Sequence, residues 1–336
     1  MGKAKPVLGI TMGDPAGVGP EIIAAALTTP AIYASCEPYV IGEAGVMQAA
    51  CRVMNAAIDV IGVESIDAVE PSAGKMIVLN EGSVDMDSFT PGEISPRAGQ
   101  AAYAYVARAT ALALEGKLDG IVTAPLNKAA LNAAGHAFSG HTEILANLCG
   151  VEDVAMMLVA GGLHVSHVST HCSLAEACSR VKTARVVRVI TLTAEALREM
   201  GCSSPRIAVA GLNPHAGEGG LFGREEIDQI VPAIDIARAK GMDVFGPEPP
   251  DTIFLRALTK TDEIQAVVAM YHDQGHIAVK MADFFGGVNL TLGLPILRTS
   301  VDHGTAFDIA WQGKASPDSM LAALELAARM AVHRKH

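Results

Sequence analysis

Short apolar runs alternate with longer helical patterns along most of this sequence, and the alternation leaves few folds open to it. Apolar runs cover residues 7–12, 38–41, 76–79, 120–125 and 206–212. Helical patterns cover residues 22–27, 96–114, 184–200 and 317–332. Strands that are apolar on both faces are typical of parallel sheets with helices packed on either side. The sequence therefore predicts an α/β fold with mostly parallel strands, in which 154–160 and 163–169 form a hairpin or adjacent strands.

The size and the charge of the chain narrow its architecture and its partners. A chain of 336 residues, half of them hydrophobic, buries a large core and is long enough for two lobes. We expect one lobe from residues 1–135 and 290–336, and the other from residues 136–289. The net charge of −11 argues against nonspecific nucleic-acid binding, which needs a basic surface. If the substrate is an anion, its few cationic contacts must be placed specifically.

The sequence indicates neither a membrane span nor a disulfide framework. No apolar stretch reaches the roughly 18 uninterrupted residues of a transmembrane helix, and the sequence from Met1 to Pro6 lacks the apolar segment of a signal peptide. We therefore expect a cytoplasmic protein with no membrane partner. The six cysteines form no Cys-x-x-Cys pair and lie mostly in apolar surroundings, so we interpret them as reduced core thiols.

A glycine-rich loop, Gly13–Glu21, follows the first apolar run and precedes the first helical pattern. Pro20 suits the first turn of that helix. The order of strand, glycine loop and helix is that of a phosphate-binding loop, but no Lys-Ser or Lys-Thr follows the glycines, and the third glycine of the dinucleotide-binding fingerprint is missing. We interpret the segment as a tight turn with weak phosphate-binding potential.

Three histidines stand just after apolar runs. His171 follows the run at 163–169, His215 follows 206–212, and His272 follows 266–271. Since ligands bind at the carboxyl edge of open α/β sheets, these imidazoles are candidates to converge there. Three imidazoles without a fourth protein ligand describe a catalytic metal site that is open to substrate. Three independent loop histidines are the alternative interpretation.

Other polar residues near these histidines have supporting roles in this interpretation. Asp273 and Glu218 are placed to orient the imidazoles from outside. His164 and His167 lie within the run that precedes His171, and we interpret them as core residues or as outer neighbours of the site.

Several residues suit an anionic group. His141 and Thr142 precede the apolar helix at 144–148, where backbone N–H groups attract an anion, although a simple helix cap explains them equally well.

A further cation, Lys280, ends a short apolar run after His272 that we interpret as a strand. With Asn289 and Arg298 on neighbouring strands, Lys280 forms a predicted clamp for a phosphate or carboxylate, which favours an anionic small substrate.

Six segments together resemble the 4-hydroxythreonine-4-phosphate dehydrogenase family. They occur in order along essentially the whole chain, at Gly13–Glu21, Val122–Lys128, Gly140–Glu143, Asn213–Gly220, Met270–Gly275 and Arg298–Thr305. The resemblance implies a two-lobed α/β fold similar to the isocitrate and isopropylmalate dehydrogenases, with mixed, mostly parallel sheets and a cleft between the lobes. It also implies a homodimer whose active sites are completed across the interface.

The resemblance also implies roles for individual residues. One divalent metal per site, with Zn, Co, Mn, Ni or Mg as candidates, would be bound by His171, His215 and His272. The substrate, chiefly its phosphate, would be contacted by His141, Thr142, Lys280, Asn289 and Arg298.

The segment at 303–310 is similar to the loop that holds the adenosine part of NAD in isopropylmalate-type enzymes. This similarity implies that NAD, or NADP as the alternative, is bound by Gly304, Thr305, Ala306 and Asp308.

The family that the sequence resembles has branches with different substrates. One branch oxidises 4-phosphooxy-L-threonine on the route to pyridoxal phosphate, and another oxidises 4-phospho-D-threonate or 4-phospho-D-erythronate. A more distant branch dehydrogenates terephthalate dihydrodiols, which offer no phosphate to the predicted clamp. His276 after Gly275 is similar to the sugar-acid branch, whereas the biosynthetic enzymes usually have an apolar residue there. The sequence therefore favours the sugar-acid branch, with 4-phosphooxy-L-threonine as the alternative.

The predicted reaction is an NAD-dependent and metal-dependent oxidation at C3, with decarboxylation, of a 4-phosphorylated 3-hydroxy four-carbon acid. For the general base, Asp251 and Lys128 are candidates from their loop positions, and a metal-bound hydroxide is a third. A metal-dependent aldolase or hydrolase that uses the same histidines without a nucleotide is the rival from another enzyme class. A scaffold or sensor without activity is disfavoured, since no ligand or clamp residue is missing.

Overall fold

The computed structural model describes residues 5–82 and 84–334 of the chain. Contacts divide the chain into two compact units. Unit 1 comprises residues 1–154 and 294–336, and unit 2 comprises residues 155–293. The divisions thus fall after residues 154 and 293, whereas the sequence predicts them after 135 and 289. Residues 1–4, on which the prediction of no signal peptide partly rested, lie outside the described residues.

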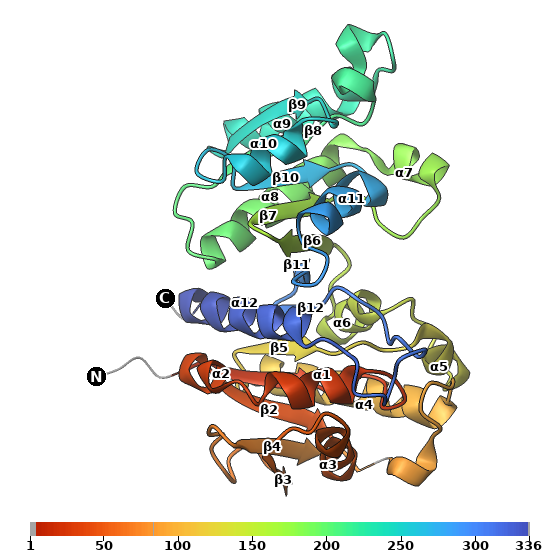
Figure 1. Cartoon of the computed structure of the whole chain (residues 1–336). Coiled ribbons are helices and arrows are strands. Elements are labelled where there is room, and N and C mark those ends of the chain that lie inside the picture. The colour runs from red at the N-terminus through yellow and green to blue at the C-terminus, as the bar shows by residue number, and fades with distance from the viewer. Residues whose placement is uncertain (1–4, 83, 335–336) are drawn as a thin grey trace. The chain divides into compact units, whose positions relative to one another are not determined.

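In the described residues of unit 1, six strands lie side by side, and each is parallel to its neighbours within the unit (Figure 1). In sheet order they are β3 (Asp59–Val63), β4 (Lys75–Asn80), β2 (Glu37–Gly42), β1 (Val7–Thr11), β5 (Gly120–Thr123) and β12 (Arg298–Val301). The central strands β1 and β5 are buried almost throughout, as the apolar runs predict. Burial on both faces requires helices on both sides of the sheet.

The described residues of unit 1 form eight helical segments. They are α1 (Gly19–Ala26), α2 (Pro30–Ser35), α3 (Ala44–Val53), η1 (Met86–Ser88), α4 (Pro96–Leu114), α5 (Lys128–Ala133), α6 (His141–Cys149) and α12 (Asp318–Arg334) among the described residues. The longest, α4, begins at the position that the alanine-rich pattern predicts, with Ser95 as its N-cap and proline at its first turn.

The sheet of unit 2 is mixed. In order its strands are β11 (Val288–Leu292), β6 (Ala155–Ala160), β7 (Leu163–His167), β10 (Ala266–Ala269), β8 (Arg206–Ala210) and β9 (Asp243–Glu248). The first three pair antiparallel, and β6 and β7 form the predicted hairpin. From β7 onward the pairing is parallel. The predicted α/β fold with mixed, mostly parallel strands is therefore confirmed.

The helical segments of unit 2 connect these strands and pack against them. In the described part of the unit they are α7 (Leu174–Arg180), α8 (Thr183–Glu199), η2 (Pro214–Gly220), η3 (Glu226–Ile230), α9 (Val231–Ala239), α10 (Ile253–Thr259) and α11 (His272–Ala282). The unit has its own core, built on residues of β7, β8 and β10 such as Val165, Ala208 and Val267. None of the helices in the described part of the chain is long and apolar enough to cross a membrane.

The segment that leads to Lys280 is a helix, so its interpretation as a strand is wrong. Helix α11 runs from His272 to Ala282 and carries Lys280 in its last turn. Gly275, His276 and Val279 are buried, whereas Ile277 and Met281 are 63% and 83% exposed. This spacing of three to four residues is helical. Three apolar residues, Ile277 to Val279, are too few to distinguish a helix from a strand by pattern alone.

The cysteines differ more in exposure than the sequence suggests. Cys36 and Cys51 are buried, which agrees with the prediction of core thiols. Cys149, Cys172 and Cys202 are only partly buried, and Cys178 is exposed. The prediction is therefore wrong for four of the six, since apolar neighbours in sequence do not by themselves bury a residue on a helix surface or in a loop.

Candidate active site

Two of the three predicted metal ligands, His171 and His272, follow adjacent parallel strands of unit 2. In the sheet, Ala269 of β10 is paired with His167 of β7. His272 stands three residues beyond Ala269, and His171 stands four beyond His167. Since the two strands are parallel and in register, both chains leave the sheet at the same edge. The rings of the two histidines lie with their centroids 5.6 Å apart.

A cavity of about 470 Å³ lies beside these two histidines. It is lined by residues of the loop after β7, of α7 and of the start of α11, namely Thr170, His171, Cys172, Leu174, Ala177, Tyr271, His272 and Asp273. Nδ1 of His272 lies 2.7 Å from Oδ1 of Asp273. A carboxylate in this position orients the ring and leaves Nε2 available to a metal ion, which is the role predicted for Asp273.

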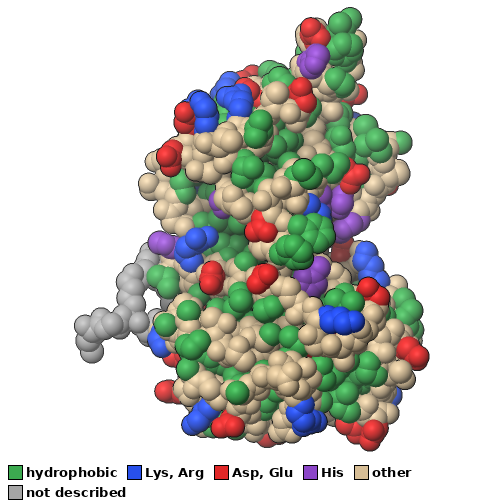
Figure 2. Space-filling model, in the orientation of Figure 1, with side chains coloured by type: hydrophobic (Ala, Val, Ile, Leu, Met, Phe, Trp, Pro, Cys, Tyr) green, Lys and Arg blue, Asp and Glu red, His purple; other side chains and the backbone are tan. Residues whose placement is uncertain are grey.

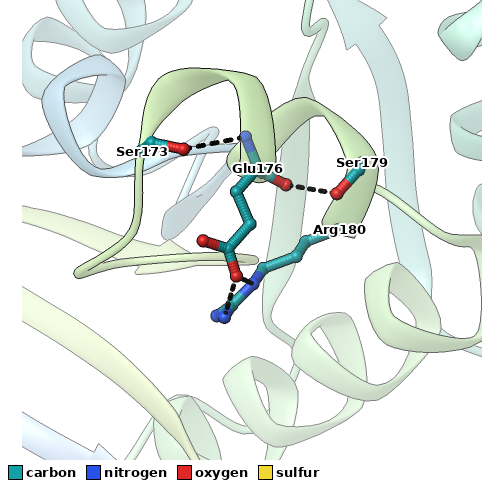
Figure 3. A network of polar contacts seen from close by, with 4 residues as sticks. All are labelled: Ser173, Glu176, Ser179 and Arg180. Atoms are coloured by element: carbon teal, nitrogen blue, oxygen red, sulfur yellow. Dashed lines mark hydrogen bonds and ion pairs between the residues drawn. The ribbon is translucent and has the colours of Figure 1, made fainter.

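Helix α7 forms one wall of this cavity, and local hydrogen bonds hold it in place (Figure 3). Ser173 Oγ accepts from the backbone N of Glu176 at 3.2 Å, which caps the helix. Arg180 donates to Oε1 of Glu176 from Nε at 3.1 Å and from Nη2 at 2.6 Å. Ser179 Oγ donates to the backbone O of Glu176 at 2.7 Å. These contacts stiffen a short helix that would be marginal alone.

The third predicted ligand, His215, lies elsewhere in unit 2. It follows β8, which is the parallel neighbour of β10, but it belongs to η2, on a segment that projects from the rest of the unit between β8 and α9 (Figure 1). There its Nδ1 lies 3.3 Å from Oε2 of Glu218, and its ring packs edge-on against Phe222 with centroids 6.1 Å apart. Within the described residues of one chain, no group of three or more His, Cys, Asp or Glu side chains is arranged to hold a metal.

The backbone explains why His215 leaves the sheet edge. Five consecutive residues of η2, from His215 to Gly219, have positive φ angles between 44° and 79°. Positive φ is unfavourable for side chains other than glycine. Buried Glu226 stabilises the turn, because its Oε1 accepts from the backbone N atoms of Leu212 and Asn213 at 2.8 and 2.7 Å.

A second polar site lies in unit 1 around Arg298. This side chain is only 2% exposed, and it donates to Oγ1 of Thr123 from Nε at 3.2 Å and from Nη2 at 2.8 Å. Burial lowers the pKa of Arg298 to about 9, and the carboxylate of Glu143 partly opposes the shift. At neutral pH the guanidinium therefore stays charged in a place with little water.

His141 lies beside this guanidinium at the first turn of α6. Burial, together with the charge of Arg298, lowers the pKa of His141 well below its ordinary value, so the imidazole is neutral. In the described part of the chain, Nε2 of His141 is buried without a hydrogen-bond partner. The helix is preceded by Gly140, which has no side chain to cap it, so the backbone N–H groups of His141 and Thr142 face outward for another acceptor.

A cavity of about 90 Å³ opens at this point, with room for roughly three water molecules. Its lining combines hydroxyl groups, His141 and the start of the predicted NAD loop, namely Thr123, Pro125, Leu126, His141, Ser300, Val301, His303 and Gly304. Thr123, Glu143 and Ser300 were not singled out from the sequence, although all three stand inside segments that carry the family resemblance.

The loop at 303–313, which contains the predicted NAD contacts, packs on the glycine-rich loop of unit 1. A Cβ atom on Gly17 would lie 2.9 Å from Cβ of Thr305, and the backbone N of Val18 donates to O of Thr305 at 3.0 Å. Buried Glu21 accepts from the backbone N atoms of Trp311 and Gly313. The glycines thus permit close packing, which favours the interpretation of 13–21 as a structural turn.

The remaining predicted site residues lie in both units. Lys128 is exposed at the first position of α5 in unit 1, and Asp251 is exposed before α10 in unit 2. Asn289 lies on β11, and its Oδ1 is buried with no hydrogen-bond partner among the described residues. Lys280 lies on α11 with its Nζ 5.5 Å from the ring centroid of Phe284. Because α11 is a helix, Lys280 stands about 12 Å along its axis from His272.

Comparison with known proteins identifies the family of the chain. A family model described as pyridoxal phosphate biosynthetic protein PdxA matches residues 34–327. The chain belongs to the PdxA family. This confirms the resemblance that the six sequence segments indicate.

Individual relatives within the PdxA family are similar over nearly their whole length. A 4-hydroxythreonine-4-phosphate dehydrogenase of Desulforapulum autotrophicum is 46% identical over 328 residues, which cover 97% of this chain and 96% of the relative. A D-threonate 4-phosphate dehydrogenase of Salmonella typhimurium is 47% identical over 322 residues, which cover 96% and 98%. The crystal structure of a 4-hydroxythreonine-4-phosphate dehydrogenase from Burkholderia phymatum is 46% identical, with a TM-score of 0.86, and the match covers 98% of this chain and 99% of that one.

These relatives are dehydrogenases, and their names divide between the two phosphorylated substrates that the sequence predicts as alternatives. This chain is 46% identical to the 4-hydroxythreonine-4-phosphate dehydrogenase and 47% identical to the D-threonate 4-phosphate dehydrogenase, so it is about equally similar to both.

Proposed function

We propose that this PdxA-family protein is an NAD-dependent, metal-dependent dehydrogenase of a 4-phosphorylated 3-hydroxy four-carbon acid, which it oxidises at C3 with loss of CO₂. The substrate that we favour is 4-phospho-D-threonate or 4-phospho-D-erythronate. The alternative is 4-phosphooxy-L-threonine, which differs in carrying an amino group at C2.

The observation that carries the proposal is the polar pocket of unit 1. Its lining includes His141, whose Nε2 is buried without a hydrogen-bond partner among the described residues, and the buried guanidinium of Arg298 and the N-terminus of α6 lie beside that imidazole. Each of these features favours an anionic oxygen, and together they can bind several oxygens of one group. A phosphate offers three such acceptors on one atom. We therefore propose that Arg298, His141 and Thr142 bind the phosphate, and we retain Asn289 and Lys280 as proposed substrate contacts.

The donors in unit 2 fit a divalent metal only in part. His171 and His272 are imidazoles of the type that Zn²⁺, Co²⁺, Mn²⁺ and Ni²⁺ accept, and Asp273 orients one of them. A catalytic site of this type takes three protein ligands, and one chain brings two together. We propose that the third is His215 of the partner subunit in a homodimer.

Exposed apolar side chains on unit 2 support a homodimer. On and after α11, the exposed fractions are 63% for Ile277, 83% for Met281, and 66% each for Phe284 and Phe285. Hydrophobic side chains also gather on the projecting segment that carries His215 (Figure 2), where Leu221 is 73% exposed. Apolar surfaces of this kind mark protein interfaces. The first lies on the helix that begins with His272, so a partner bound there would come close to the candidate metal site.

In the proposed reaction the chain holds the substrate and removes water around it. When bound, the divalent metal supplies a Lewis acid that lowers the pKa of the C3 hydroxyl, and NAD accepts the hydride from C3. Arg298 and His141 fix the phosphate end, so that binding energy remote from C3 sets its orientation. Gly304, Thr305, Ala306 and Asp308 are proposed to hold the adenosine part of the nucleotide.

The proton of the C3 hydroxyl needs an acceptor. Lys128 and Asp251 are both exposed and therefore able to exchange a proton with solvent. They come from different units, and we retain both as candidate bases. Replacing each by alanine and measuring kcat against pH separates them, because loss of the base removes the fall in rate on the acid side of the profile as well as lowering the rate itself.

The experiment that tests the proposal is the formation of NADH by the purified protein with 4-phospho-D-threonate, 4-phospho-D-erythronate and 4-phosphooxy-L-threonine, each with and without EDTA. We expect the highest kcat/KM with one of the first two, and loss of activity after EDTA that added metal restores. Preference for the third compound would assign the chain to the alternative. Failure to bind NAD would favour a metal-dependent aldolase or hydrolase.

A further inference from the structure

Two further histidines, His167 and His276, lie behind His272 in the buried part of unit 2. The ring of His276 is stacked on that of His272, with centroids 3.5 Å apart and planes inclined by 13°. On its other side, Nδ1 of His276 lies 3.1 Å from Nε2 of His167. His167 is fully buried, and His276 is 8% exposed. The three rings therefore run from the cavity beside His272 into the core.

The hydrogen bonds of His276 define its tautomer. Its Nδ1 also lies 3.0 Å from the backbone O of His272, one helical turn earlier. A carbonyl oxygen only accepts, so Nδ1 of His276 carries the hydrogen and donates it. Nε2 of His167 can then only accept from the same N–H. The contacts thus fix both the plane and the rotation of the His276 ring.

The backbone of α11 is built to allow this contact. Gly275 is buried, and a Cβ atom added to it would lie 2.3 Å from Nε2 of His167. Any other residue at 275 would push His167 away from His276, or push α11 away from β7. Glycine in the first turn of a helix lowers its stability relative to alanine, so its presence here has a packing reason.

We propose that His276, held by His167, is a positioning residue that fixes the imidazole of His272 in the orientation needed to bind a metal ion. This inference rests on the proposed metal-dependent function. A flat ring packed 3.5 Å from that of His272 restricts rotation of the latter about its side-chain torsions. Together with Asp273 at Nδ1, it leaves the His272 ring little freedom. Partners that orient a metal ligand typically change metal affinity by about 10- to 100-fold when they are removed.

The test is the binding of Zn²⁺ alone to the full-length, metal-stripped protein, measured by isothermal titration calorimetry. His276→Asn keeps a donor near the position of Nδ1 but removes the stacked ring, and His276→Gln is a second variant in case the first fails to fold. The matched control is His164→Gln. His164 belongs to the same strand as His167 but points to the opposite face of the sheet, because the two are an odd number of residues apart.

We expect a fall of about 10- to 100-fold in Zn²⁺ affinity for the His276 variants, with less than about a threefold change for His164→Gln. We also expect Gly275→Ala to weaken Zn²⁺ binding, although it alters no histidine. A folded His276 variant that binds Zn²⁺ as tightly as the parent would overturn the inference and make His276 a core residue only. If the parent itself binds no Zn²⁺, the proposed metal centre fails, and the inference fails with it.

Discussion

Arg298 and Thr123 are joined by two hydrogen bonds across the parallel strands β12 and β5, both to the single Oγ1 atom of Thr123. A guanidinium has five N–H donors in a fixed plane, and this contact uses two of them from one side. The side chain is therefore held rigidly at the sheet edge, with its charge intact, beside an imidazole that is neutral. Such an arrangement is prepared for an anion before any anion binds.

Replacement of Arg298 tests whether its guanidinium binds the anionic group of the substrate. We expect Arg298→Ala to weaken the binding of a phosphorylated substrate by roughly 1.5–3 kcal/mol, about 10- to 150-fold in KM, since a charge-assisted hydrogen bond is lost. Thr123→Val leaves the guanidinium charge and removes the two hydrogen bonds that hold the side chain. We therefore expect this variant to weaken the binding of the phosphorylated substrate by roughly 0.5–1.5 kcal/mol. Steady-state kinetics with the phosphorylated substrate measure both effects. An unchanged KM in a folded Arg298→Ala protein would remove this residue from the site.

The left-handed turn of η2 offers a second test, on stability. Gly217 and Gly219 have similar φ angles of 79° and 67°, but a Cβ atom on Gly217 would lie 2.6 Å from Oε2 of Glu226, whereas one on Gly219 would meet nothing within 4 Å. We expect Gly219→Ala to lower the stability of the turn by about 1 kcal/mol, because alanine is less favourable than glycine at positive φ. Gly217→Ala should lower the stability of the turn by roughly 1–3 kcal/mol more, because the added Cβ would push Glu226 away from the groups that it hydrogen-bonds.

Hydrogen exchange of the Leu212 and Asn213 amides measures this difference, because the projecting segment can open without global unfolding. Both amides donate to Glu226, so their protection reports on the turn itself. Equal loss of protection in the two alanine variants would contradict the steric argument at Gly217.

Asp14 in the glycine-rich loop predicts a dependence of stability on pH. Burial raises the pKa of Asp14 from 3.8 to about 6, and a hydrogen bond from the backbone N of Ala16 opposes the shift. Between these two pH values the folded chain binds more protons than the unfolded chain, so the contribution of Asp14 to the free energy of unfolding falls as the pH rises. Below about pH 4 both states are protonated and the cost is absent.

Asp14→Asn removes this titration. It keeps a side-chain oxygen that can accept from the backbone N of Ala16, which lies 2.9 Å from Oδ1 of Asp14. We expect the stability of the variant relative to the parent to rise by up to about 3 kcal/mol between pH 4 and pH 7.5. Urea unfolding at the two pH values measures the change. Asp87→Asn, at an exposed carboxylate, serves as the control. A difference that does not vary with pH would contradict the prediction.

The main strands of the fold could be predicted because they are buried on both faces. The apolar runs that contain β1, β5, β8 and β10 stand out for this reason, and helix α4 stands out by its length and its caps. The edge strand β3 was not predicted, because most of its residues are exposed or half-buried and show no apolar run. The prediction of a strand at 277–280 was wrong because its three apolar residues before Lys280 suit either a helix or a strand.

In the candidate site, only the residues whose positions follow from the ends of the strands could be predicted from the sequence. The parallel register of β7 and β10 brings His171 and His272 together, as the positions of these histidines after apolar runs indicate. His215 departs from the pattern because non-glycine residues adopt positive φ around it, and no local sequence rule predicts that conformation for His215, Ala216 and Glu218. The stacking of His276 on His272 depends on α11, which the strand interpretation of 277–280 concealed.

Mixing two inactive variants tests the proposal that His215 serves the site of the partner subunit. In a shared site, His272 of one chain acts with His215 of the other. A heterodimer of His215→Ala and His272→Ala chains would then have one site with both residues intact and one with neither. Random exchange yields about half heterodimers, so we expect about a quarter of the parent activity on mixing.

The control for this mixture is a pair of variants whose residues belong to the same cluster within one chain. His171→Ala mixed with His272→Ala leaves every site with at least one missing ligand, so no activity should return. Subunit exchange is verified separately by mass spectrometry of the mixed dimers. Exchange without recovery in the first mixture would mean that His215 does not complete the partner's site, and the metal would then have to be held within one chain or be absent from the reaction.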